Sequence, residues 1–126
     1  MVLITDTHIY CANAGDARCV LSQKGQAVDL SYDHKPDLPS EKRRVLASGH
    51  MVEDGRVDGI IAISRAIGDW EYKTLTNPPE NNAVTAYPDV KRYTITKDTN
   101  FLICACDGIW DCMTSQVAVD FVNQAK

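Results

Sequence analysis

An unbroken apolar run in the last quarter of the chain constrains the fold more than any other feature of the sequence. Residues 101–106 have the length and the composition of a buried strand. Asp107 and Gly108 follow directly, so a carboxylate and a turn are expected where the sheet opens to solvent. If this turn coils into a helix, Asp111 returns a second carboxylate to the same place, because side chains four residues apart share one helix face.

Two carboxylates that converge at a sheet edge provide the oxygen ligands that hard divalent cations such as Mg²⁺ or Mn²⁺ prefer. Asp107 and Asp111 are therefore candidate metal ligands. A purely structural interpretation accounts for the same residues, because Asp-Gly is a common turn pair and Asp111 can simply cap a helix. The local pattern leaves both interpretations open.

The composition is that of one soluble globular domain. The chain has 126 residues, of which 44% are hydrophobic and 24% charged. Its net charge of -4 disfavours nucleic acid or an anionic membrane surface as the main partner. No apolar segment approaches the roughly 18–20 residues that span a bilayer, and the N-terminus lacks the basic region and apolar core of a signal peptide. We therefore expect a cytoplasmic or nuclear location.

The cysteines agree with such a reducing location. Their number, five, is odd, and their spacing gives no disulfide framework. We expect them to be buried core thiols. They are Cys11, Cys19, Cys104, Cys106 and Cys112.

Short strands separated by turns are predicted for most of the chain. They are expected at residues 1–4, 8–14, 18–21, 27–30, 59–63 and, interrupted by Pro88, 83–95. A hairpin is expected around Asp54-Gly55. Helices are expected at residues 40–48, for one turn at 64–70, and after a cap at Thr114 or Ser115. The last helix should bury Ala118, Phe121, Val122 and Ala125. Because strands outnumber helices without regular alternation, the fold class is predicted to be α+β, with helices packed on antiparallel sheet.

Several motifs follow one another in an order that is more specific than any one of them. Among them are Asn13-Ala14-Gly15-Asp16-Ala17-Arg18, Asp33-His34-Lys35-Pro36, Ser64-Arg65-Ala66-Ile67-Gly68-Asp69, Tyr87-Pro88-Asp89-Val90 and Asp107-Gly108-Ile109-Trp110-Asp111. The series resembles the metal-dependent type 2C protein serine/threonine phosphatases, the PPM family, over nearly the whole chain. The resemblance implies an α-β-β-α sandwich of antiparallel sheets with helices on the outer faces. It also implies that phosphoserine and phosphothreonine proteins are hydrolysed by water activated by Mg²⁺ or Mn²⁺.

The resemblance assigns roles to three aspartates. Asp107 matches the family aspartate that binds one ion of the catalytic pair. Asp111 and Asp16 match acidic residues that, with Asp107, hold an additional, weaker metal in some members. The alternative for Asp16 is a turn residue that bonds its own backbone after Gly15.

Residues 34–57 resemble the flap beside the family's active site. Lys35 and Arg56 are candidates to supply positive charge for a phosphopeptide, and ordinary solvated surface charge is the competing interpretation. Arg65 and Asp69 are expected to form a structural pair within their turn. His34 is expected to be a hydrogen-bonding loop residue.

Other family elements do not occur in residues 1–126. They are a phosphate-gripping arginine, an early acidic pair, an Asp-Gly-His-Gly-Gly loop and a C-terminal Gly-Asp element, so no catalytic general acid is assigned. We therefore expect a partial domain that lacks the N-terminal metal-binding strands and the extreme C-terminal metal-binding element. Such a chain would be inactive alone, would leave apolar faces uncovered, and would have the missing N-terminal half as a partner. The alternative is a non-catalytic pseudophosphatase that binds phosphoproteins.

Overall fold

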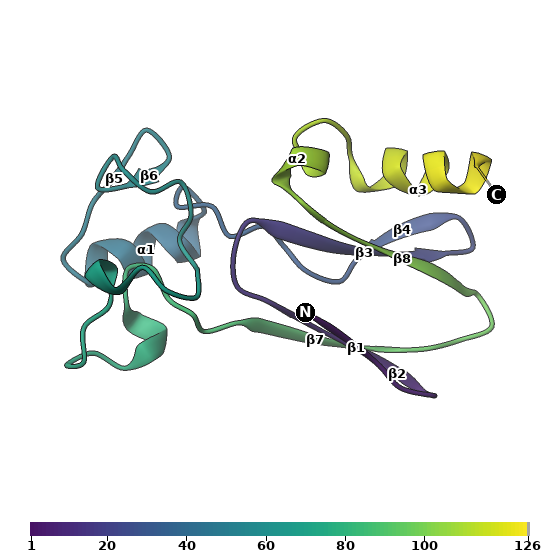
Figure 1. The fold of residues 1–126 in the computed structure, drawn as a ribbon, viewed down its shortest axis with the longest axis horizontal. Helices are drawn as coiled ribbons and strands as arrows, with labels where there is room; N and C mark the ends of the chain where they lie inside the picture. Colours follow the sequence, from purple (N-terminus) through teal and green to yellow (C-terminus); the bar gives the residue numbers. More distant parts are fainter. Residues whose placement is uncertain (126) are drawn as a thin grey trace. The chain divides into compact units, whose positions relative to one another are not determined.

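Two units make up the structure, a computed structural model that describes residues 1–125. The first unit contains Met1–Asn13, Ala17–Tyr32 and the chain from Asp89 onward. The second contains Ala14–Asp16 and Asp33–Pro88. Each unit is therefore assembled from segments that are far apart in sequence (Figure 1).

Two antiparallel three-stranded sheets form the framework of the first unit. One has the order β1-β2-β7 and the other the order β4-β3-β8. The strands are β1 Val2–Ile4, β2 His8–Asn13, β3 Ala17–Gln23, β4 Gln26–Asp29, β7 Asp89–Thr94 and β8 Thr99–Cys106. The apolar run predicted as a strand is confirmed as β8. Its burial is only partial, because among residues 1–125 this edge strand pairs with β3 alone.

Strand β3 is buried on both faces and joins the layers of the first unit. On one face, Cys19 and Leu21 pack with Ile9 and Cys11 of β2 to form the core between the sheets. On the other face, Val20 packs with side chains of two helices, α2 (Asp107–Trp110) and α3 (Ser115–Gln124). The helices thus lie on the β4-β3-β8 sheet (Figure 1). The predicted α+β class is confirmed.

Helix α3 begins as its sequence predicts. The side chain of Thr114 accepts a hydrogen bond from the Val117 N–H at 3.3 Å, which satisfies one of the unpaired donors of the first turn. The predicted buried face is partly wrong. Ala118 is buried, but Val119 is the second fully buried residue and Phe121 is 68% exposed.

The second unit is built around helix α1. Its elements are α1 Pro39–Ala47, β5 Val52–Glu53, β6 Arg56–Val57 and the 3-10 turns η1 Trp70–Tyr72 and η2 Pro79–Asn81. Val45 of α1 packs in a core with Val57, Tyr72, Ala83 and Val84. The predicted helix and hairpin are confirmed. Asp54 and Gly55 both have positive φ, at 49° and 73°, as a two-residue hairpin turn of type I′ requires.

Further local predictions are wrong. Residues 59–63 form no strand and contribute only an isolated bridge between Val57 and Ile61. Residues 64–69 form no helical turn, because Arg65 forms a bridge with Thr85, and a 3-10 turn begins only at Trp70. Of the five cysteines, only Cys11 and Cys19 are buried. The other three are exposed because β8 is an edge strand and α2 lies at the surface.

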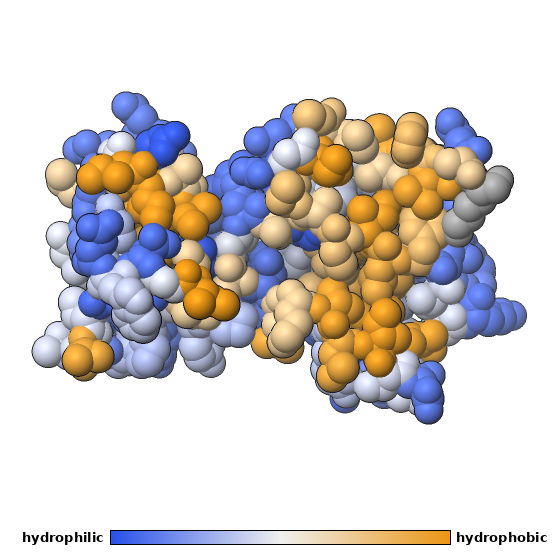
Figure 2. Space-filling view, in the orientation of Figure 1, coloured by the Kyte–Doolittle hydropathy of each residue, from blue (hydrophilic) through white to orange (hydrophobic). Residues whose placement is uncertain are grey.

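Large apolar side chains are exposed in both units (Figure 2). In the first unit these include Leu3 and Val90 of the β1-β2-β7 sheet, at 58% and 66%. In the second they include Ile67, Trp70 and Leu75, at 92%, 78% and 104%.

A buried carboxylate, Glu41 on α1, ties the second unit together. It is 1% exposed, and its Oε1 accepts a hydrogen bond from Arg65 at 2.7 Å. Its Oε2 accepts from Arg44 at 2.8 Å, Ser64 at 2.7 Å and Arg65 at 3.0 Å. The predicted Arg65–Asp69 pair is therefore wrong, because Glu41 offers Arg65 a bidentate acceptor in a site screened from water.

The environment of Glu41 controls its protonation. Burial by itself would raise the pKa, but hydrogen bonds from Arg65, Arg44 and Ser64 outweigh it and lower the pKa from 4.5 to about 2. A shift of this size corresponds to roughly 3 kcal/mol of interaction with the charged form. Ionised Glu41 therefore stabilises the folded second unit.

Replacing Glu41 by Gln should destabilise the chain by about 3–5 kcal/mol, because it leaves two mostly buried guanidinium groups without their anion. The matched control is Glu80→Gln, at an exposed position of η2, which should change stability by less than about 0.5 kcal/mol. Urea unfolding followed by circular dichroism measures both. Equal stabilities for the two variants would contradict a structural role for Glu41.

The same carboxylate should make stability depend on acid. Because the pKa of Glu41 is lower in the folded chain, its contribution is complete above pH 4.5 and is lost as the pH falls toward 2. The stability difference between the wild-type chain and the Glu41→Gln variant should therefore shrink over this range. Urea midpoints measured at a series of pH values test this expectation, and a difference that stays constant would refute it.

Candidate active site

The predicted pair of aspartates lies on one helical turn at the end of β8. Asp107 is the first residue of α2, and Asp111 is its C-terminal cap. The Asp111 N–H donates to the Asp107 carbonyl oxygen at 2.7 Å, so the turn coils as the sequence predicts. Both residues are exposed. The spacing puts their side chains on one side of the turn, open to solvent.

Trp110 fixes this turn to the sheet. Trp110 is only 7% exposed, and its indole N–H donates to the Ala105 carbonyl oxygen of β8 at 2.8 Å. The guanidinium of Arg18 lies 5.1 Å from the centre of the same ring, a favourable cation–π arrangement. The two exposed aspartates are therefore held on a buried aromatic anchor.

A depression of about 630 Å³ lies beside Asp111 and is lined by residues of β3, β4 and the α2–α3 connection. On its wall, Arg18 donates to the Ser115 hydroxyl at 3.0 Å, which donates to Asp29 at 2.7 Å. These two hydrogen bonds hold the Arg18 guanidinium and the Asp29 carboxylate next to Asp111. Sequence reasoning did not assign a role to Arg18, although it ends the first of the ordered motifs.

Asp16 belongs to the second unit, where a turn from residues 14–16 is bonded to residues 34 and 35. Gly15 has φ +143°, a conformation that favours glycine. Its N–H donates to Nδ1 of the buried His34 at 3.2 Å, and its carbonyl accepts from the His34 N–H at 3.1 Å. The prediction of His34 as a hydrogen-bonding loop residue is confirmed. Nζ of Lys35 lies 3.4 Å from an Asp16 carboxylate oxygen, so this ammonium would compete with a metal ion for that oxygen.

The hairpin of the predicted flap is braced by a pair that sequence reasoning missed. Nδ1 of His50 lies 2.7 Å from an Asp58 carboxylate oxygen. The pKa of Asp58 is lowered by the Met51 N–H and by His50, which both hydrogen-bond to the carboxylate. Arg56 is exposed, and its guanidinium donates to the Ile60 carbonyl at 2.8 Å. Part of its charge remains open to a ligand.

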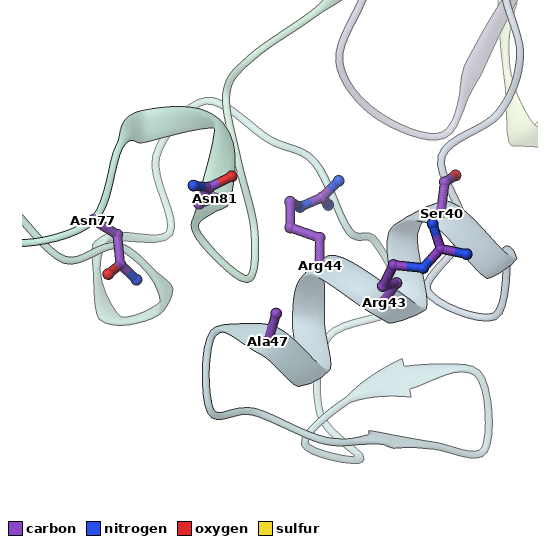
Figure 3. A pocket seen from close by; sticks show the side chains of 6 residues that line it. All are labelled: Ser40, Arg43, Arg44, Ala47, Asn77 and Asn81. Carbon is purple, nitrogen blue, oxygen red and sulfur yellow. The ribbon is translucent and has the colours of Figure 1, made fainter.

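A separate pocket of about 390 Å³ lies between α1 and the loop around η2 (Figure 3). Its lining includes two arginines of α1 but no carboxylate. The Arg44 guanidinium donates hydrogen bonds to the Glu41 carboxylate and to the carbonyl oxygens of Ser64 and Asn82. Arg43, in contrast, is exposed. The pocket is therefore distinct in chemistry from the aspartate turn.

The described residues offer few ligands for a divalent cation. Among residues 1–125, no three His, Cys, Asp or Glu side chains gather in a way that could hold a metal ion. The pair Asp107 and Asp111 does suit Mg²⁺ or Mn²⁺, because Mg²⁺ commonly takes one or two carboxylates and keeps several waters. The described residues thus provide part of a metal site rather than a closed cage.

Comparison with known proteins identifies the family. The sequence model for protein phosphatase 2C matches residues 1–126. The chain belongs to the protein phosphatase 2C family. It is 56% identical over 117 residues to protein phosphatase 2C homolog 2 of Schizosaccharomyces pombe, covering 92% of this chain and 32% of that protein. It is 51% identical over 125 residues to probable protein phosphatase 2C 60 of Arabidopsis thaliana, covering 98% of this chain and 35% of that protein.

Solved structures of the 2C phosphatases share the fold. Serine-threonine phosphatase 2C from Toxoplasma gondii superposes with a TM-score of 0.83 at 24% identity, over 98% of this chain and 45% of that one. A phosphatase from a pathogenic strain of the same organism gives 0.74 at 39% identity, over 82% and 32%. The chain spans about a third of the length of the curated relatives it matches. Within residues 1–125, no helix has both the length and the apolar character needed to cross a membrane.

Proposed function

We propose that this chain is the part of a metal-dependent protein serine/threonine phosphatase that presents Asp107 and Asp111 to a divalent cation, Mg²⁺ or Mn²⁺. The observation that carries the proposal is the aspartate turn itself. Two exposed carboxylates share one helical turn at the end of β8, and buried Trp110 holds that turn in place. Membership of the protein phosphatase 2C family supports the reaction class.

The metal would supply an activated water and would neutralise charge on the phosphoryl oxygens. The residues of this chain would act in simpler ways. Asp107 and Asp111 would bind the cation, while Trp110 and its bond to Ala105 would keep both carboxylates in place. Asp16, which belongs to the other unit, would be open to a metal only when its ion pair with Lys35 is exchanged.

The substrates proposed are phosphoserine and phosphothreonine proteins. Arg56, at the exposed turn of the β5–β6 hairpin, is the better placed of the two flap cations to meet a phosphopeptide, because Lys35 is directed at Asp16. We propose that turnover requires the further sequence that the relatives possess, since two carboxylates cannot retain a pair of divalent ions. The exposed apolar side chains of both units are consistent with further protein that covers them.

Replacing Asp107 by Asn should weaken Mn²⁺ binding by at least about tenfold, because the substitution removes an anionic ligand. The control is Asp6→Asn, an exposed aspartate in the turn before β2 of the same unit, which should leave the affinity unchanged. The electron paramagnetic resonance signal of free Mn²⁺ reports binding directly. Equal affinities for the two variants would exclude Asp107 as a ligand.

Catalytic competence can be tested in a chimera. The matching 117-residue segment of the Schizosaccharomyces pombe protein is 56% identical, and it can be replaced by the corresponding residues of this chain. The chimera should hydrolyse a phosphothreonine peptide in the presence of Mn²⁺, and Asp107→Asn should reduce its kcat/KM by at least about 100-fold. The control is Asp6→Asn if the exchanged segment includes Asp6, and Asp120→Asn on α3 if it does not. The control variant should not reduce activity.

The activity of the isolated chain should be measured beside that of the chimera. Residues 1–126 alone should show no Mn²⁺-stimulated turnover of the same peptide. A folded but inactive chimera would favour the pseudophosphatase alternative. Turnover by the isolated chain that depends on Asp107 would refute the proposal that further sequence is required.

A further inference from the structure

Two thiols face each other across the β3–β8 strand pair of the first unit. Cys19 of β3 and Cys104 of β8 are direct partners in the antiparallel register, and their Sγ atoms are 3.5 Å apart. Neither belongs to the aspartate turn. The buried Cys11 of β2 lies against the same pair and, with both, lines a cavity of about 80 Å³.

The backbone around Cys19 shows which kind of pair this is. The Cys19 N–H donates to the Ser31 hydroxyl, and the Cys19 carbonyl accepts from the Leu30 N–H, both at 2.9 Å. Both main-chain groups of Cys19 therefore point to the β4 side, away from β8. In an antiparallel sheet this makes Cys19 and Cys104 a non-hydrogen-bonded pair, whose Cα atoms are about 4.5 Å apart. That spacing falls within the range of roughly 4.4–6.8 Å that a disulfide spans.

The two thiols differ in accessibility. Cys104 is exposed, whereas Cys19 is only 4% exposed. Burial raises the pKa of the Cys19 thiol strongly, and the neighbouring Cys104 and Cys11 thiols raise it further. An oxidant in solution would thus reach Cys104 first, and Cys19 would be the second thiol, already in contact with it.

We propose that Cys19 and Cys104 form a redox-sensitive pair that a hydroperoxide converts into a reversible cross-strand disulfide. The Cys104 thiolate attacks one oxygen of hydrogen peroxide, the O–O bond breaks, and hydroxide leaves as Cys104 becomes a sulfenic acid. The Cys19 sulfur then attacks the Cys104 sulfur and the S–O bond breaks. The departing hydroxide takes the Cys19 proton, so two thiols and one peroxide yield one disulfide and two waters.

The neighbouring cysteine on β8 provides a matched control. Cys106 is exposed, lies two residues from Cys104 and therefore on the same face of the strand. Its partner in the register is Ala17, which has no thiol. Pairing across the sheet, rather than exposure alone, thus distinguishes Cys104. The inference is independent of the proposed phosphatase activity.

The folded chain should be treated with equimolar hydrogen peroxide at low protein concentration, alkylated, and digested with trypsin. Thiols titrated in denaturant should fall from five to three, because one disulfide consumes two of the five cysteines. Mass spectrometry should find the peptide of residues 19–24 joined to that of residues 98–126, with the bond at Cys104. Dithiothreitol should restore all five thiols.

Three variants make the outcome decisive. The Cys106→Ser variant should still lose two thiols. The Cys104→Ser variant should form no disulfide to the peptide of residues 19–24. Cys19→Ser should leave a sulfenic acid on Cys104 that dimedone traps. The proposal is overturned if the bond forms through Cys106, Cys112 or Cys11, if only disulfide-linked dimers appear, or if oxidation of Cys104 goes to the sulfinic acid with no disulfide.

Discussion

The pairing of β3 with β8 is the interaction on which the first unit depends. Strand β3 is buried on both faces, so it carries the core between the sheets and the core under the helices at once. Strand β8 is held in register by β3 and ends where α2 begins. The position of Asp107 and Asp111 is therefore set by the β3–β8 ladder and a tryptophan anchor, while both aspartates are exposed.

The second unit contains a different stabilising feature, an ionised carboxylate that is buried away from solvent. Glu41 receives both guanidinium groups and a hydroxyl, and it joins α1 to the segment around Ser64 and Arg65. A buried ion-pair cluster of this kind stabilises the fold only when every member is present, because removal of one member leaves the other buried charges without a partner. The proposed flap residues thus belong to a unit that combines an apolar core with a buried ion-pair cluster, whereas the proposed metal-binding turn belongs to a unit stabilised by apolar packing.

Sequence reasoning succeeded where the determining interactions are local. The strand before Asp107, the turn after it, the hairpin at Asp54-Gly55 and the Thr114 cap depend on neighbours within a few residues, and all four are confirmed. It failed where the deciding partner is distant. Arg65 bonds to Glu41, 24 residues away, and not to Asp69.

The same distinction applies to the candidate site and to the cysteines. The common turn of Asp107 and Asp111 could be predicted from their spacing. The ion pair of Asp16 with Lys35 could not, since 18 residues that include strands β3 and β4 separate them. The exposure of Cys104 depends on which strands lie beside β8, and no pattern within residues 101–106 encodes it.

The most direct test of the central claim is to map where a paramagnetic cation binds. In an amide nuclear magnetic resonance spectrum of the isotope-labelled chain, substoichiometric Mn²⁺ should broaden the signals of residues 107–111 before any others in the first unit, because relaxation falls steeply with distance from the ion. Broadening centred on another part of that unit, with residues 107–111 unaffected, would contradict the assignment of this turn as the metal-binding element of a phosphatase.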